Sequence, residues 1–323
     1  MLRRFAAPVA VLLAFAVPAT AQSLADAKTC DQAIGGSAKD RITLQKLSAA
    51  KPVTSPTSMF AAGCLDVIAA RWDSAAAHFD AAAKGNPKSS AAWLWVGNIT
   101  GQLARLGSAP TKVQLAPAIR DAYAKAIALD GNNIDAREGL MQYLLQSPLP
   151  LGGDKTKAGE QALAIGKVDA FRGLSAQLAV ASSMNDRPVL ERLLTQATTQ
   201  FPDSLLGWAN LSALLADDKR ASAAFATITR WQATHRNPMF ALFSIGRTAA
   251  VTGEQQERGV QALQQFLRGQ RGPNDPPLAN AHYRLAQIYE RQNKKSEART
   301  EYTTAVALNP RLRDAQLALA RLK

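Results

Sequence analysis

The segment from Ala279 to Pro310, ANAHYRLAQIYERQNKKSEARTEYTTAVALNP, constrains the fold most strongly. Its small and aromatic residues recur at helical spacing in two stretches, which the polar turn 291–295 separates. Each stretch therefore predicts an amphipathic helix, and Pro310 ends the second because proline cannot continue a helix. Alanine on the facing sides lets the two helices lie close together. The segment thus predicts an antiparallel helical hairpin.

The same order of large, small and aromatic residues returns upstream and, about 34 residues downstream, at Leu319-Ala320, and it resembles the tetratricopeptide repeat. One hairpin cannot bury its apolar face alone, so successive copies must stack into one continuous core. The resemblance implies an all-α, right-handed superhelical solenoid of about seven helical hairpins. The repeats are expected near residues 56–87, 90–131, 134–170, 171–202, 205–238, 239–275 and 279–310. Segments 22–55 and 313–323 are expected to be the N-terminal and C-terminal capping helices.

A more specific resemblance covers residues 91–162. The stretch WLWVGNITGQLA is followed, after a loop, by AYAKAIALDGNNIDAREGLMQYLLQSPLPLGGDKTKAGEQA. This arrangement resembles a group of exported bacterial tetratricopeptide proteins. The sequence departs from that pattern at Val96, where leucine is usual, and at Gly131, where proline is usual. The resemblance implies an architecture and export from the cell, and it implies no particular chemistry.

The first 21 residues have the features of a secretory signal peptide. Arg3 and Arg4 precede an apolar run over residues 5–17, and residues 19–21 are small at the spacing that a signal peptidase reads. The run is too short to span a bilayer comfortably, although an uncleaved anchor is the alternative. We expect cleavage after Ala21 and a periplasmic or secreted mature protein with no transmembrane segment.

Two cysteines, Cys30 and Cys64, follow the predicted cleavage site. An even number of cysteines in an oxidising compartment favours a disulfide. The bond would close a loop of about 35 residues and contribute about 3–4 kcal/mol to stability. It would also fix the N-terminal segment to the first repeat. The alternative is a pair of buried thiols, because Cys64 lies in an alanine-rich helix.

The stretch LPLGGDKTKA, residues 149–158, combines glycines with a lysine and a threonine. A phosphate-binding loop needs G-x-x-x-x-G-K-[ST] after a strand, whereas here Asp154 separates the glycines from Lys155. We therefore expect an elbow between two helices, with an anion site as the alternative. In this interpretation Gly152 and Gly153 allow a turn with positive φ, and Asp154 caps the following helix.

Catalytic motifs are scarce in the sequence. The segment Ser48–Lys51 fits the S-x-x-K of penicillin-recognising enzymes, and 183–185 loosely fits their second element. The third element, K-T-G, is missing from the sequence, and helical repeats leave no place for the required sheet. The histidines, His78, His235 and His282, match no metal-binding spacing. We predict a protein that is not an enzyme and that has no cofactor or metal.

In tetratricopeptide arrays the first helix of each hairpin lines a concave groove, and the resemblance carries this role to matching positions here. The expected groove residues are Asn98, Gln142, Phe240, Phe243, Arg247, Asn280, Tyr283 and Gln287, with Phe60, Leu94 and Glu138 also facing outward. Phe240, Phe243, Arg247 and Tyr283 would form an aromatic and cationic patch of the kind found at binding hot spots. The alternative is that the phenylalanines only pack between adjacent helices.

The charge of the chain is +13, and it is concentrated toward the C-terminus. Residues 217–323 contain 17 Lys and Arg against 9 Asp and Glu. Export and the scattering of these residues argue against nucleic acid as a partner. The leading hypothesis is a non-catalytic periplasmic scaffold that binds a protein or extended peptide in the groove. The alternative is an envelope-associated module that binds cell-wall polymer or anionic lipid through the basic C-terminal third.

Overall fold

The fold was analysed in a computed structural model, which describes residues 28–322 apart from 237, 271 and 274. The signal-peptide prediction for residues 1–21 lies outside this range. All regular elements of the described residues are helices, which confirms the all-α class. In this part of the chain, no helix combines the length and the apolar character that a membrane span requires.

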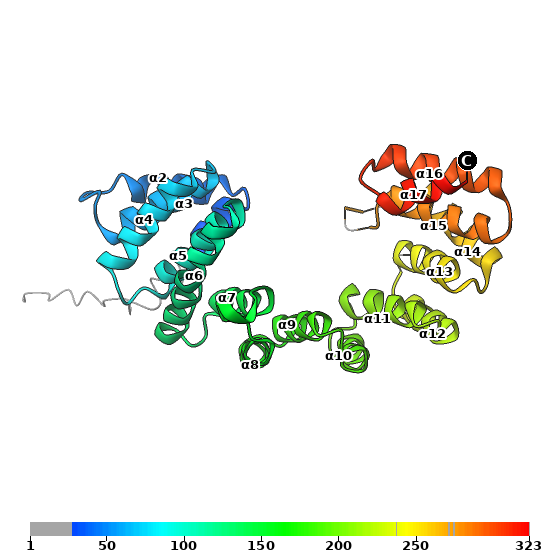
Figure 1. The fold of residues 1–323 in the computed structure, drawn as a ribbon, viewed down its shortest axis with the longest axis horizontal. Coiled ribbons are helices and arrows are strands. Elements are labelled where there is room, and N and C mark those ends of the chain that lie inside the picture. The colour runs from blue at the N-terminus through cyan, green and yellow to red at the C-terminus, as the bar shows by residue number, and fades with distance from the viewer. Residues whose placement is uncertain (1–27, 237, 271, 274, 323) are drawn as a thin grey trace, which may run out of the picture. The chain divides into compact units, whose positions relative to one another are not determined.

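The chain divides at Val180 into two compact units, whose helices can be followed in Figure 1. In the first unit residues 28–34 are helical and precede α2. The further elements are α2 (Ala38–Ser48), α3 (Pro56–Ile68), α4 (Trp72–Gly85), α5 (Ser90–Leu106), α6 (Ala109–Leu129), α7 (Ile134–Gln146), η1 (Leu149–Leu151) and α8 (Lys155–Gly166). The helices pack as the hairpins α3–α4, α5–α6 and α7–α8, and each hairpin contacts the next. Helix α9 (Ala170–Ser183) contains the boundary between the units.

The second unit continues the same arrangement. Its elements are α10 (Arg187–Gln200), α11 (Leu205–Asp217), α12 (Ala221–Thr234), α13 (Met239–Thr252), α14 (Gln256–Arg268), α15 (Leu278–Arg291), α16 (Lys295–Leu308) and α17 (Arg313–Arg321). The pairs α11–α12, α13–α14 and α15–α16 form hairpins, and α17 packs on α16. The first helices of successive hairpins, α11, α13 and α15, also contact one another. Side chains from neighbouring hairpins can therefore meet on one face of this unit.

Several hairpins share one type of turn. Ala70, Lys219 and Asn293 follow the first helix of their hairpins and take φ values of 55°, 62° and 60°. In each case the N–H of the next residue donates to the carbonyl five residues earlier, at 2.9, 2.8 and 2.9 Å. This bond closes the C-terminal end of the first helix and starts the second within two or three residues. The turn between α13 and α14 is different, because Gly253 directly after α13 and Gln255 directly before α14 take left-handed φ values of 84° and 51°.

Close packing of the two helices depends on small residues in the first helix. A Cβ atom added to Gly63 would lie 2.9 Å from the ring of Phe79, and one on Gly97 would lie 2.8 Å from the ring of Tyr123. A Cβ on Gly246 would lie 2.1 Å from Cγ of Leu263. The large residue of the second helix thus occupies the space that the missing side chain leaves. This explains the small and large residues that recur through the sequence.

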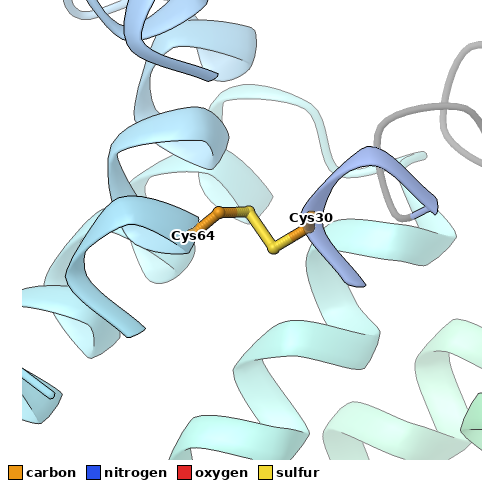
Figure 2. The surroundings of a disulfide bond; sticks show 2 residues. All are labelled: Cys30 and Cys64. Atoms are coloured by element: carbon orange, nitrogen blue, oxygen red, sulfur yellow. A yellow bond between two sulfur atoms is a disulfide. The ribbon is translucent and has the colours of Figure 1, made fainter. Parts of the chain in front are cut away.

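The predicted disulfide between Cys30 and Cys64 is confirmed, and both sulfur atoms are buried (Figure 2). It holds the N-terminal helical residues against α3, while α2 packs on the same helix. These segments cover a face that the sequence analysis assigned to the groove. Phe60 is therefore only 5% exposed and belongs to the hydrophobic core with Leu44. Leu94 is also buried, at 3% exposure, so the expectation that both residues face outward is wrong.

Candidate functional site

The glycine stretch between α7 and α8 is an elbow, as the sequence predicted. The carboxylate of Asp154 accepts hydrogen bonds from the backbone N–H groups of Thr156 and Lys157, both at 3.0 Å, and so caps α8. Gly152 takes a left-handed φ of 89°. Gly153 does not, contrary to expectation, but a Cβ there would lie 1.8 Å from the carbonyl oxygen of Ser147. Gly153 is thus required by the close approach of the backbone rather than by its dihedral angles.

Hydrogen bonds fix this elbow against the end of α7. The backbone N–H of Asp154 donates to the carbonyl of Leu144 at 2.9 Å, and the N–H of Gly153 donates to that of Pro148 at 3.1 Å. The hydroxyl of the buried Tyr143 donates to the carbonyl of Leu151. The elbow therefore has a defined position, and it can form part of a binding surface.

The elbow lines a hollow of about 730 Å³ in the first unit, hereafter the first groove. Its other walls come from α5, α6 and α7, and they include Asn98, Ala116, Tyr123, Glu138 and Gln142. Helices α5 and α6 have 17 and 21 residues, whereas α3 and α4 have 13 and 14. The first groove is thus built by two departures from the regular repeat, the long α5–α6 hairpin and the elbow.

The walls of the first groove combine aromatic surface with amide groups. The hydroxyl of Tyr123 donates to Oδ1 of Asn98 at 2.9 Å, and burial raises the pKa of Tyr123 to about 12. The phenol therefore stays neutral, and its bond leaves the NH₂ group of Asn98 as the donor of that side chain. Gln142 is exposed, and its Oε1 accepts from Nε2 of Gln146 at 3.1 Å. Both predicted residues of the first unit thus lie in one groove.

An ion-pair cluster borders this groove. Arg172 of α9 donates to Glu138 at 2.9 and 2.7 Å and to Asp135 at 2.5 Å. The bonds to Glu138, followed by those to Asp135, raise the pKa of Arg172. The pKa of Asp31 is raised to about 6, first by partial burial and then by repulsion from the carboxylate of Asp135. Asp31 therefore lies close enough to the cluster to interact with it electrostatically. The disulfide-bonded N-terminal segment therefore lies near the acidic border of the first groove.

In the second unit, Phe240, Phe243 and Arg247 meet at a cavity of about 200 Å³ between α11 and α13. Phe240 is only 6% exposed, and its ring meets that of Trp231 edge-on with centroids 5.3 Å apart. Phe243 is half-buried and lies 5.6 Å from the ring of Phe266. Both phenylalanines thus pack in the core and also form walls of the cavity. We call this cavity the arginine pocket.

Tyr283 and Gln287 lie in a different hollow, of about 600 Å³, between α15 and α17. Nε2 of Gln287 donates to the hydroxyl of Tyr283 at 3.0 Å, and the ring of Tyr283 lies 5.9 Å from that of Tyr302. Asn280 is half-buried in the first turn of α15. The aromatic and cationic residues expected in one patch are therefore divided between two hollows of the second unit.

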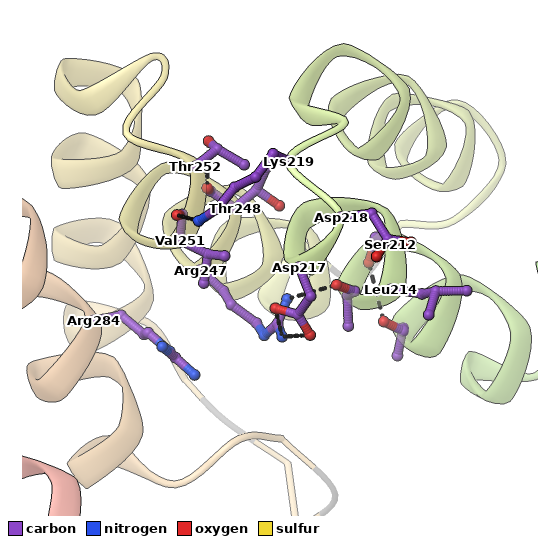
Figure 3. Close-up of polar contacts among 12 residues, drawn as sticks. Ser212, Leu214, Asp217, Asp218, Lys219, Arg247, Thr248, Val251, Thr252 and Arg284 are labelled. Atoms are coloured by element: carbon purple, nitrogen blue, oxygen red, sulfur yellow. Dashed lines mark hydrogen bonds and ion pairs between the residues drawn. The ribbon is translucent and has the colours of Figure 1, made fainter. Parts of the chain in front are cut away.

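Arg284 was missed by the sequence analysis. Figure 3 shows its side chain extending from α15 toward Arg247 and Asp217. Its NH1 donates to Oε1 of Gln287 at 2.8 Å, and its guanidinium lies 5.1 Å from the centroid of the Tyr283 ring. Within the described part of the chain, no carboxylate lies within the 4.0 Å of an ion pair with Arg284. One feature of the sequence pointed to this residue: the helix α13, which packs against α15, contains no acidic residue that could pair with Arg284.

The candidate catalytic residues have structural contacts. The hydroxyl of Ser48 donates to the carbonyl of Gln45 in its own helix at 3.0 Å. His78 lies 2.7 Å from Asp66, and His282 lies 2.5 Å from Glu301. Over the described ranges, no group of three His, Cys, Asp or Glu is placed to hold a metal ion. These contacts give no support to the S-x-x-K interpretation.

Comparisons with known proteins identify the architecture. The family model of the tetratricopeptide repeat matches residues 279–312, which cover the α15–α16 hairpin apart from its first residue, Leu278. No curated protein matches the sequence. A tetratricopeptide repeat protein from Parabacteroides merdae aligns over 83% of this chain and 98% of its own, with 14% identity and a TM-score of 0.55. Yeast Tom70 aligns over 98% of this chain and 66% of its own, with 14% identity and a TM-score of 0.54. At this level of identity the likeness establishes the fold alone.

Proposed function

We propose that this chain, which contains a tetratricopeptide repeat at residues 279–312 and has the fold of tetratricopeptide arrays, is a non-catalytic scaffold. In this proposal it binds a protein partner, through an extended segment of that partner, on the first helices of its hairpins. The proposed location is the periplasm or the outside of the cell.

The observation that carries this proposal is the first groove. Its volume of about 730 Å³ falls in the range of pockets that hold ligands. Tyr123 and Leu151 supply apolar surface, and the amides of Asn98 and Gln142 supply donors and acceptors that suit a peptide backbone. The long α6 and the elbow add walls that the repeat itself does not need for stacking. A role in binding accounts for their presence.

The disulfide supports the proposed location. Disulfides persist in oxidising compartments and are rare in reducing ones. Cys30 and Cys64 are bonded, and the sequence before them has the pattern of a cleaved signal peptide. N-terminal sequencing of the protein recovered from the cell envelope should therefore give Gln22 as the first residue. A protein that still begins at Met1 would contradict the export proposal.

Photocrosslinking in intact cells tests the binding surface. A photoreactive residue is placed at Gln142, which is exposed in the first groove, and in a second strain at Glu160, which is exposed on α8. Mass spectrometry of the products should identify one dominant protein from Gln142 and not from Glu160. Equal and diffuse labelling from the two positions would count against the groove as the binding surface.

The alternative, binding of cell-wall polymer or anionic lipid by the basic C-terminal third, receives less support. Several of its arginines are already neutralised, because Arg220, Arg247 and Arg321 pair with Glu191, Asp217 and Glu290 at 2.6–3.0 Å. Sedimentation with purified sacculi and with anionic vesicles tests it directly. Binding that disappears as salt is raised would favour this alternative over the groove.

A further inference from the structure

The hollow of about 600 Å³ at the end of the second unit, hereafter the C-terminal hollow, is lined by two helical stripes. Residues that are three and four positions apart share one side of a helix. The stripe on α15 consists of Tyr283, Gln287 and Glu290. The stripe on α17 consists of Asp314, Leu317 and Arg321. Two regular helices thus present six side chains to one hollow.

The charges that line the C-terminal hollow balance one another. Glu290 and Asp314 are its acidic residues, and Arg291 and Arg321 are its basic ones. Glu290 pairs with Arg321 at 2.7 Å, and Arg291 donates to the carbonyl of Ala250 at 2.9 Å. The lining therefore offers a charged ligand no excess of the opposite sign, and it suits a neutral, polar ligand better.

Several groups in this hollow can still form hydrogen bonds. The hydroxyl of Tyr283 accepts from Nε2 of Gln287 at 3.0 Å, and burial raises the pKa of Tyr283, so the phenol keeps its own proton for donation. Arg321 uses one nitrogen of its guanidinium for Glu290, which leaves further N–H donors. Among the described residues, the carboxylate of Asp314 has no hydrogen-bond or ion-pair partner. The hollow thus offers both donors and an acceptor to a ligand.

The polar groups of α15 are already held in position. Oε1 of Gln287 accepts from the guanidinium of Arg284 at 2.8 Å, and Oε2 of Glu290 accepts from the hydroxyl of Tyr302 at 2.8 Å. Tyr302 is only 1% exposed, so the core fixes the place of the Glu290 carboxylate. A ligand that binds here needs to order few side chains, which lowers the entropic cost of binding.

Apolar surface lies beside these polar groups. The side chain of Tyr283 is half-buried, and Leu317 is 59% exposed. A pyranose ring has an apolar face of C–H groups and an edge of hydroxyl groups, each of which can donate and accept. An aromatic ring bordered by donors and acceptors matches this division between face and edge. The C-terminal hollow therefore has the chemistry of a sugar-binding site.

The stripe on α17 matches one further group, the acetamido group of an amino sugar. Such a group contains a carbonyl acceptor, an N–H donor and a methyl group. Arg321 supplies a donor for the carbonyl, Asp314 an acceptor for the N–H, and Leu317 an apolar surface for the methyl group. Covering the exposed Leu317 would also remove apolar surface from water, which favours binding.

We propose that the C-terminal hollow binds a neutral oligosaccharide whose pyranose rings carry acetamido groups. One sugar ring lies against Tyr283, and its acetamido group lies on the stripe of α17. This ligand goes beyond the scaffold function, because it occupies a site in the other unit. It also differs from the ligands of the anionic alternative, because a neutral saccharide needs no excess of positive charge.

Calorimetric titration of the full mature protein with two trisaccharides tests the proposal. Triacetylchitotriose carries an acetamido group on each of its β-1,4-linked rings, and cellotriose has the same linkage with hydroxyl groups in their place. We expect triacetylchitotriose to bind with a dissociation constant between about 10 μM and 1 mM, and cellotriose to bind at least about threefold more weakly. Because the ligand is neutral, its affinity should change less than about twofold between about 50 and 500 mM salt.

Variants of exposed residues connect binding to this hollow. Asp314→Asn should weaken triacetylchitotriose by about tenfold, because it removes a charged hydrogen-bond acceptor. The matched control is Glu297→Gln, which changes an exposed acidic residue in the first turn of α16 and should leave the affinity unchanged. Leu317→Ala should lower the affinity for triacetylchitotriose toward that for cellotriose. Thermal unfolding of the three variants should match that of the parent protein, since all three side chains are exposed.

Three outcomes would overturn the inference: no binding of triacetylchitotriose up to about 5 mM, equal affinity for the two trisaccharides, or no effect of Asp314→Asn. Tighter binding of glycylglycine than of triacetylchitotriose would also reject it, because the balanced charges would then serve a zwitterion. The scaffold proposal depends on crosslinking from Gln142 in the first unit. If Gln142 captures a partner and the trisaccharides do not bind, the scaffold proposal stands and the saccharide site is rejected.

Discussion

The carboxylate of Asp66 and the imidazole of His78 lie 2.7 Å apart in the first hairpin, and the Asp66 side chain is only 5% exposed. The same carboxylate accepts hydrogen bonds from Arg71 at 2.8 Å and from Ser74 at 2.5 Å. Burial by itself would raise the pKa of Asp66, but the bonds from Ser74, Arg71 and His78 outweigh it and hold the pKa below its ordinary value. The ionised form is therefore the one that stabilises the folded hairpin.

Replacing Asp66 by asparagine should make the stability of the protein less dependent on pH. A carboxyl whose pKa is lower in the folded state contributes stability above about pH 4, and this contribution is lost as the pH falls through the folded pKa. We expect Asp66→Asn to lower the free energy of unfolding by about 2 kcal/mol at pH 7 and by less at pH 3. Urea denaturation at the two pH values measures this.

The control for this prediction is Asp80→Asn. Asp80 pairs with Lys84 at 2.6 Å, but both side chains are exposed, so its loss should cost less than about 0.5 kcal/mol. If the two variants lose equal free energy of unfolding, the Asp66 cluster stabilises the protein no more than an exposed ion pair does.

Ala70→Gly should stabilise the first hairpin. Ala70 has a φ of 55°, a conformation that is unfavourable for a residue with a Cβ atom and free of strain for glycine. The free energy of unfolding should rise by about 0.5–1 kcal/mol. This net value includes the cost of the greater backbone entropy that glycine has in the unfolded chain. Ala69→Gly, at a φ of −88°, should instead lose stability. A gain in both variants, or in neither, on thermal unfolding would contradict the role of the left-handed turn.

Gly246→Ala should destabilise the second unit. The new Cβ atom would lie 2.1 Å from Cγ of Leu263, and neither helix can move without disturbing its neighbours. We expect a loss of about 1–3 kcal/mol by overpacking. Gly101→Ala is the matched control, because nothing lies within 4 Å of its added Cβ atom and alanine favours a helix, for a gain of up to about 1 kcal/mol. Denaturant unfolding should therefore show changes of opposite sign.

Removal of the disulfide by Cys30→Ser and Cys64→Ser together should cost about 3–4 kcal/mol, because the bond restricts a loop of 34 residues in the unfolded chain. Guanidinium denaturation of the double variant and of the oxidised parent measures the difference. The reduced parent protein should unfold at nearly the same denaturant concentration as the double variant. If oxidised and reduced parent proteins unfold together, the bond does not contribute to stability.

Features set by short stretches of sequence could be predicted. The hairpins follow from helical spacing and turn residues, and the cap by Asp154 follows from its position before a helix. Burial of Phe60 could not be predicted, because it depends on α2 and residues 28–34 folding back over α3. Arg284 has no carboxylate partner among the described residues because α13, which ends more than 30 positions earlier, contains no acidic residue. Such pairings become visible only when the register between hairpins is known.

The first groove has a consequence for how such a chain can diversify. Its distinctive walls come from the long α5–α6 hairpin and from the elbow after α7. Insertions at these two places can alter the size and polarity of the groove while the glycine and aromatic contacts between helices stay intact. For the scaffold proposed above, the choice of partner can therefore change through the lengths of this hairpin and this elbow while the stacking of the hairpins is kept.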